Sequence, residues 1–150
     1  MLKRSPTFES LIAELNKLPG IGRKSAERIA YHFVKASREE VMSLASALKA
    51  VKDNIISCST CFNLAEKDPC PICEDPSRDA AQILVVEDAM DIAAFERAGV
   101  YKGRYHVLQG RIVPLKGITP EHLRIRELVE RVRGGAVKEV ILATDPDVEG

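Results

Sequence analysis

The four cysteines of the sequence form two pairs, Cys58–Cys61 and Cys70–Cys73. Two residues separate the cysteines of each pair, so both sulfur atoms can turn inward at a tight loop. Two such loops can present four thiolates in the tetrahedral arrangement that Zn²⁺ prefers. Four thiolates leave no open position for water, so the spacing predicts a structural zinc centre and not a catalytic one.

Two disulfides, or a thioredoxin-like redox pair, are the alternatives to zinc. No apolar leader segment follows Met1, which favours a cytosolic protein, and disulfides are disfavoured there. We also see no apolar run of the length that spans a membrane. The sequence therefore favours zinc in a cytoplasmic protein without a membrane segment.

The charge balance limits how the chain could bind nucleic acid. The 150 residues include 22 basic and 22 acidic side chains, and 45% of residues are hydrophobic. A net charge of zero argues against a uniformly basic nucleic-acid binder, but it permits a local basic patch.

A local patch of this kind is predicted at residues 18–26, with the sequence LPGIGRKSA, between two expected helices. The glycines allow a tight turn with exposed backbone N–H groups, and the positive N-terminus of the next helix points the same way. This arrangement would bind one phosphate of a DNA backbone without reading bases. An ordinary helix–turn–helix corner is the alternative. The residues expected to contact DNA are Gly20, Gly22, Arg23, Lys24 and Arg28.

Three carboxylates follow expected strands in the second half of the chain. Glu87 closes one apolar strand, and Asp145 and Asp147 follow another. Groups beyond the carboxyl ends of neighbouring parallel strands meet in one crevice, so these acids could hold Mg²⁺. The alternative is that Asp145-Pro-Asp147 is a polar turn.

Hydrophobic periodicity predicts a multidomain α and α/β fold. The expected parts are a helical domain over 1–55, a small zinc loop over 56–76 and an α/β domain with a parallel sheet over 77–150. We expect helices at 5–18, 23–34, 37–55, 89–98 and 119–133, and strands at 82–86, 105–108 and 137–144. A sheet of this kind normally continues past its third strand, so we expect a chain shortened at its C-terminus.

Several side chains are predicted to be structural. The third helix should turn Val41, Leu44, Leu48 and Val51 inward. The charged run 124–133 should be a solvated helix face, because its basic and acidic residues alternate. The histidines are spaced unlike metal ligands and are expected to be structural or surface residues: His32, His106 and His122.

These motifs resemble known families. The stretch 18–26 resembles the helix-hairpin-helix motif of DNA-repair proteins, and the strand ending in Glu87 with the later D-x-D-x-x-G resembles the Toprim domain of topoisomerases, primases and some nucleases. Helix-hairpin-helix, four-cysteine loop and Toprim, in this order, resemble the RecR family of bacterial recombination mediators across nearly the whole chain. Further similar stretches are residues 70–79, 85–88, 103–108 and 142–146.

The resemblance implies a non-enzymatic, ring-like homodimer or homotetramer that encloses duplex DNA or junctions of single- and double-stranded DNA. It implies work with RecO and RecF in loading RecA onto DNA coated by single-strand-binding protein, near the nucleoid. Lys24 and Arg28 match DNA-contacting positions, the four cysteines match zinc ligands, and Glu87 lies where RecO would dock. Many members have Asn at the position of Asp145, so metal binding is favoured more here. A Mg²⁺-dependent nuclease or primase-like enzyme is the alternative, and a scaffold without DNA contact is a third.

Overall fold

The computed structural model of the chain describes residues 5–148 and 150. These residues divide into two compact units with the boundary after Asp53. The second unit contains both the cysteine loop and the parallel sheet, and it begins at Asn54. The division into three domains at 55/56 and 76/77 stays a prediction.

The first unit consists of helices, and side-chain hydrogen bonds cap the first and the third of those described. The Ser5 hydroxyl accepts a 3.2 Å hydrogen bond from the Phe8 N–H, and Pro6 occupies the first helical turn. Ser37 and Glu40 exchange the two hydrogen bonds of the predicted capping box, at 3.0 and 3.2 Å. The helices are α1 (Pro6–Leu15), α2 (Arg23–Lys35) and α3 (Arg38–Asn54).

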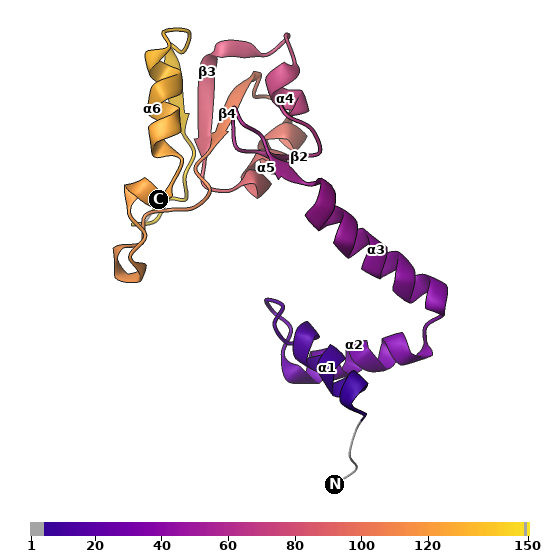
Figure 1. Ribbon diagram of the computed structural model, residues 1–150. Helices are drawn as coiled ribbons and strands as arrows, with labels where there is room; N and C mark the ends of the chain where they lie inside the picture. The colour runs from indigo at the N-terminus through magenta and orange to yellow at the C-terminus, as the bar shows by residue number, and fades with distance from the viewer. Residues whose placement is uncertain (1–4, 149) are drawn as a thin grey trace. The chain divides into compact units, whose positions relative to one another are not determined.

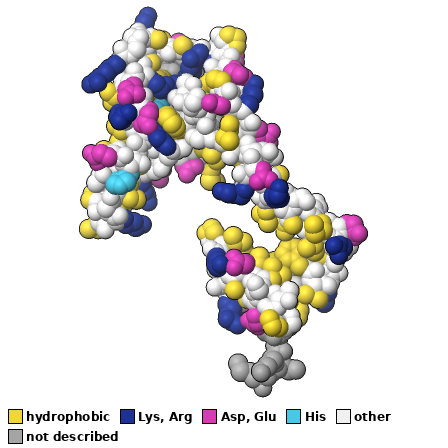
Figure 2. All heavy atoms as spheres, in the orientation of Figure 1, with side chains coloured by type: hydrophobic (Ala, Val, Ile, Leu, Met, Phe, Trp, Pro, Cys, Tyr) yellow, Lys and Arg dark blue, Asp and Glu magenta, His cyan; other side chains and the backbone are white. Residues whose placement is uncertain are grey.

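A small apolar core joins α1 to α2. Ile12, Ala26 and Ala30 are buried in it. The helix α3 has no buried residue, and Leu44, Leu48 and Val51 are 44%, 63% and 59% exposed. The prediction that this stripe turns inward was therefore wrong for this chain, because α1 and α2 pack on each other and leave it uncovered within their unit. Figure 2 shows hydrophobic side chains gathered on the surface of this unit.

The second unit is built on the parallel sheet that the sequence predicted, and its three strands lie in the order β4-β3-β5. A separate antiparallel pair, β1 with β2, belongs to the cysteine loop. The strands are β1 (Ile56–Ser57), β2 (Leu64–Ala65), β3 (Asp79–Val86), β4 (Gly103–Val107) and β5 (Glu139–Leu142). The helices are α4 (Pro71–Glu74), α5 (Ala89–Ala98) and α6 (Ile125–Arg133), with 3₁₀ turns η1 (Pro114–Lys116) and η2 (Pro120–His122).

Side chains of the central strand β3 alternate between two apolar cores. Leu84 and Val86 pack with Ile92 of α5, whereas Ile83 and Val85 pack with a group that includes Leu128 of α6. The helices α5 and α6 therefore cover opposite faces of the sheet (Figure 1). This arrangement explains why β3 is apolar on both faces.

The predicted helix over 119–133 is interrupted in the structure. Thr119 and His122 form a local capping box around η2, and Leu123 then adopts an extended conformation. Leu123 is buried, and the Arg124 N–H donates a 3.0 Å hydrogen bond to the Leu108 carbonyl. The tertiary contact at Leu108 thus delays the start of α6 until Ile125. In the residues described, no helix has the length and apolar character needed to cross a membrane.

Candidate functional site

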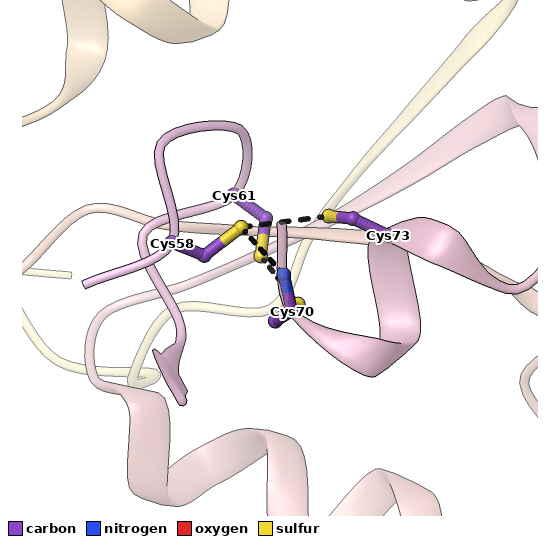
Figure 3. A group of neighbouring side chains, drawn as sticks. All are labelled: Cys58, Cys61, Cys70 and Cys73. Carbon is purple, nitrogen blue, oxygen red and sulfur yellow. Dashed lines mark hydrogen bonds between the residues drawn. The ribbon is translucent and has the colours of Figure 1, made fainter. Parts of the chain in front are cut away.

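The four cysteine sulfur atoms converge from two short elements. Cys58 and Cys61 lie on the turn between β1 and β2, whereas Cys70 caps the start of α4 and Cys73 lies within that helix. All four sulfur atoms lie within 4.8 Å of one another, and Figure 3 shows them pointing toward a common centre. Two separations are 3.9 Å, for Cys58 to Cys73, and 3.5 Å, for Cys61 to Cys70.

These separations fit a tetrahedral zinc site. A tetrahedron with Zn–S bonds of about 2.3 Å has sulfur atoms about 3.8 Å apart, close to the two separations measured. The Cys70 N–H also donates to the Cys58 sulfur at 3.3 Å, so the backbone orients a ligand. All four cysteines are free thiols, which disfavours the disulfide alternative. The residues present therefore fit a structural Zn²⁺ held by four thiolates.

The thiols influence one another because they are crowded and buried. A hydrogen bond from Cys61 lowers the pKa of Cys73 to about 6, and the hydrogen bond with Cys73, together with burial, raises the pKa of Cys61. Burial also raises the pKa of Cys70. Ionising all four thiols in this space requires a compensating cation. A divalent metal supplies that compensation and couples its binding to the folding of the loop.

The cysteine loop is attached to the edge of the sheet at β4. The Val107 N–H donates a 2.8 Å hydrogen bond to the Cys61 carbonyl. Phe62, which has a φ of 63°, places its ring edge-on to His106 at 5.4 Å between centroids. The Arg124 guanidinium lies over the Phe62 ring, 4.8 Å from its centre. The metal loop and the α/β sheet therefore form one packed unit.

The start of α2 has the features predicted for a phosphate cradle. Gly20 has a φ of +76°, a left-handed conformation that favours glycine, and Gly22 caps α2 without a side-chain hydrogen bond. Lys24 and Arg28 are exposed, and neither forms an ion pair with the residues described. Arg23 differs, since it lies 3.6 Å from Glu9 and 3.5 Å from Glu27. Its charge is therefore partly offset, and its DNA contact stays a prediction.

The structure brings the three predicted acids to the carboxyl end of the sheet, together with an arginine that the sequence did not single out. The Asp145 N–H donates to the Glu87 carboxylate at 3.0 Å. Arg111 Nη1 lies 2.8 Å from Asp147 and 4.0 Å from Asp145. In the described part of the chain, only the cysteines group closely enough to hold a metal. Magnesium at the acids stays a prediction. Arg111 follows β4. The rule that residues beyond the carboxyl ends of neighbouring parallel strands lie close together could therefore have identified it from the sequence.

Sequence reasoning also missed Arg131, which it assigned to a solvated helix face. Arg131 is half-buried and donates through Nη1 to the Tyr105 carbonyl at 2.9 Å, and it lies 3.0 Å from His106 Nδ1. His106 is fully buried, with Nε2 2.7 Å from the Arg124 carbonyl, and burial lowers its pKa to about 4. His106 is therefore structural, as expected. Helical spacing could have flagged Arg131, because it borders the apolar stripe at Leu128.

Comparison with known proteins matches each part of this arrangement. Residues 8–52 match the RecR helix-hairpin-helix model, residues 55–75 match the RecR zinc finger domain with four cysteine ligands, and residues 81–150 match the Toprim domain. The order of the three matches is the order that the sequence motifs predicted.

Curated relatives give the same result over nearly the whole chain. The recombination protein RecR of Rhodopirellula baltica is 53% identical over 93% of this chain and 70% of its own length. The RecR proteins of Rubrobacter xylanophilus and Trichlorobacter lovleyi are 54% and 50% identical, over 96% and 100% of this chain and 72% and 75% of their own lengths. With its helix-hairpin-helix motif, its four-cysteine centre and its Toprim sheet in this order, the chain belongs to the RecR family of recombination proteins.

Proposed function

We propose that this chain acts as a non-enzymatic recombination mediator that binds the backbone of duplex DNA and of junctions between single- and double-stranded DNA. In this proposal several copies form a ring-like dimer or tetramer around the duplex. The assembly works in the bacterial cytoplasm, at the nucleoid, with RecO and RecF to load RecA onto DNA coated by single-strand-binding protein. The family's role in recombination and the geometry of α2 support it.

The observation that carries the proposal is the exposed, positively charged start of α2. The Gly22 cap leaves the N–H groups of the first turn without a side-chain acceptor, and the helix dipole adds partial positive charge there. Lys24 and Arg28 lie one turn apart on the same helix, exposed to solvent. An anionic backbone satisfies all of these groups at once, and it does so without regard to base sequence.

Three features favour an adaptor over an enzyme. Four thiolates saturate the metal at the cysteine centre, so this centre offers no position for an activated water. Arg111 lies among the carboxylates where a catalytic Mg²⁺ would have to bind. Burial raises the pKa of Tyr105 and raises that of Tyr101 to about 12, which makes both poor nucleophiles for a topoisomerase-like reaction.

The apolar stripe of α3 supports assembly of several copies. Leu44, Leu48 and Val51 are exposed along one helix, and association of copies through this helix would remove them from water. One hairpin binds a single stretch of backbone weakly. Several hairpins held in one assembly raise the effective concentration of each for DNA.

Fluorescence anisotropy with labelled duplex DNA tests the proposal directly. The double variant Lys24→Ala, Arg28→Ala should bind at least tenfold more weakly than the unmodified protein. Its salt dependence should lose about two units of slope for each subunit that contacts the DNA, because two phosphate contacts are removed per subunit. The matched control is Lys49→Ala, Lys52→Ala on α3. If the Lys24→Ala, Arg28→Ala variant binds duplex DNA at low salt with unchanged affinity, the DNA-clamp proposal is wrong. That result would favour a scaffold without DNA contact.

The second candidate function is a Mg²⁺-dependent nuclease or primase-like enzyme. It is favoured by the position of Glu87, Asp145 and Asp147 at one end of the sheet. Incubation of the protein with supercoiled plasmid and Mg²⁺ separates the two functions. We expect no cleavage. Cleavage that Glu87→Gln abolishes would establish the enzymatic alternative.

A further inference from the structure

The segment between β4 and α6, residues 109–123, forms a loop at the carboxyl end of the sheet (Figure 1, orange). Val113 and Ile118 close its outer part with two backbone hydrogen bonds of 3.0 and 3.1 Å, and Gly117 turns the chain at a φ of +70°. The 3₁₀ turns η1 and η2 lie within the same segment. Ligands of open parallel sheets bind at this end of the strands, so the loop lies where a binding site is expected.

The loop borders a hollow of about 510 Å³ with an apolar floor. Val113 and Leu123 line the hollow, and both side chains are buried. Gly110 lines it as well, at a φ of +142°, and a Cβ atom at this position would lie 3.2 Å from Leu123 Cδ2. A residue larger than glycine would therefore narrow the hollow. Glycine at this position keeps it open to a ligand.

Two hydrogen-bond donors lie at the rim of this hollow. Lys116 is exposed at the end of η1 and forms no ion pair with the residues described. The His122 ring is held by the Thr119 backbone N–H, which donates to Nδ1 at 3.1 Å. Because Nδ1 accepts this hydrogen bond, the hydrogen of the neutral ring lies on Nε2. The rim therefore offers one cation and one neutral N–H donor.

Arg111 lies between the hollow and the acids at the end of the sheet. It lines the hollow, and its Nη1 is 2.8 Å from Asp147 and 4.0 Å from Asp145. Its positive charge offsets those carboxylates, so they repel an anion at Lys116 less strongly. Glu121 is the one acid in the loop sequence, and it is not among the described residues that line the hollow. The rim is therefore favourable to an anion.

We propose that this hollow binds one nucleotide of single-stranded DNA, with the phosphate at Lys116 and His122 and the unpaired base against Val113 and Leu123. A nucleotide joins a flat base to an anionic phosphate, which matches an apolar floor beside a cationic rim. A duplex keeps its bases paired and stacked, so it offers no base to the hollow. The inference rests on the proposed DNA binding. It adds a contact selective for single strands to the duplex contact at α2.

Fluorescence anisotropy on the whole chain compares labelled oligothymidylate with labelled duplex DNA. We expect K116E to bind oligothymidylate about tenfold more weakly, because a phosphate contact becomes a repulsion, and to bind duplex DNA within about twofold of the unmodified protein. K138E is the matched control, since Lys138 is exposed at the opposite end of the sheet, just before β5. Equal losses for the two DNAs, or unchanged affinity for oligothymidylate, would overturn the inference.

Abasic DNA tests the contact with the base without any protein variant. A single strand of the same length that lacks its bases keeps every phosphate. The unmodified protein should bind this strand about threefold more weakly, or weaker still, because the apolar floor then has no base to cover it. Equal affinity for the two strands would mean that only phosphate is bound, and the proposed base site would be wrong.

Photo-cross-linking locates the contact and separates a DNA strand from a free nucleotide. A strand that carries 4-thiothymidine should cross-link to residues 109–123 of the unmodified protein. Unlabelled oligothymidylate should suppress this cross-link far better than thymidine monophosphate at the same nucleotide concentration. Equal suppression would identify a free nucleotide as the ligand and overturn the assignment to DNA, as would cross-links that lie only outside this loop.

Failure of this inference can be distinguished from failure of the proposed function. If the Lys24→Ala, Arg28→Ala variant loses duplex affinity while K116E keeps its affinity for oligothymidylate, the DNA-clamp proposal stands and the nucleotide site at the loop is wrong. If the α2 variant keeps its duplex affinity, the DNA-clamp proposal is wrong, whatever K116E does.

Discussion

The Val107 N–H donates a 2.8 Å hydrogen bond to the carbonyl oxygen of Cys61, which joins the cysteine loop to the edge of the parallel sheet. The loop contains only short elements, β1, β2 and α4, and its core consists mainly of cysteine sulfur. Such a loop cannot bury enough apolar surface to fold alone. A metal and the strand edge together supply the missing constraint.

Removal of a zinc ligand should therefore destabilise the second unit. Cys61→Ser should lose the bound metal and lower the Tm by on the order of 10 °C, since metal binding contributes to folding free energy. Metal analysis and thermal unfolding check this. Glu66→Gln is the control, because Glu66 is exposed on the same loop and is not a cysteine ligand. A zinc-free Cys61→Ser protein with an unchanged Tm would show that the metal is dispensable for folding.

The buried His106 should make the protein less stable in acid. Its pKa is about 4 when folded and about 6.5 in an unfolded chain, so the unfolded state binds more protons between these values. The stabilisation is complete above pH 6.5 and is lost as the pH falls to 4, by about 3 kcal/mol at most. Denaturant unfolding of the zinc-loaded protein from pH 7 to 4 measures it.

Comparison with His106→Gln isolates this contribution, because protonation of the thiolates affects both proteins. The variant should be less stable at pH 7, and its stability should fall less steeply between pH 6.5 and 4. Parallel curves for the two proteins would mean that His106 does not titrate over this range.

Tyr105→Phe should lower stability by about 1–3 kcal/mol. The Tyr105 hydroxyl donates a 2.6 Å hydrogen bond to Glu96, and its side chain is fully buried. Glu96 also pairs with Arg78, so the variant leaves a carboxylate with one partner fewer. Chemical denaturation gives the change. Tyr31→Phe, at an exposed ring that contacts Phe8, should change the free energy of unfolding by less than about 0.5 kcal/mol. Equal effects of the two changes would contradict this reading.

Arg111→Gln should increase the affinity of the sheet end for divalent cations by about tenfold. Arg111 lies 2.8 Å from Asp147, and its removal leaves the acids without that positive charge. Isothermal titration with Mg²⁺, or Mn²⁺ in its place, measures the change, with Arg97→Gln on α5 as the control. No gain in affinity would mean that the acids are too far apart to act as ligands.

The sequence alone determined the features that depend on short-range spacing. Two C-x₂-C pairs are enough to place four sulfur atoms around one metal, and the glycines before Arg23 are enough to expose a helix start. The capping residues Ser5 and Ser37, and the alternation of β-branched strands with helices, likewise predicted helix starts and a parallel sheet that the structure confirms. These signals are local because they arise from the backbone conformation of a few residues and from the interval at which apolar side chains recur along a helix or strand.

Only the tertiary structure decided which charges are compensated, and by what. Arg131 and Arg111 looked like other basic residues in the sequence, yet one lies half-buried beside His106 and the other lies among acids from a distant strand. The apolar stripe of α3 looked like a core face and is exposed within this chain. Burial and electrostatic pairing depend on residues far apart in sequence, so they are fixed only when the strands and helices pack.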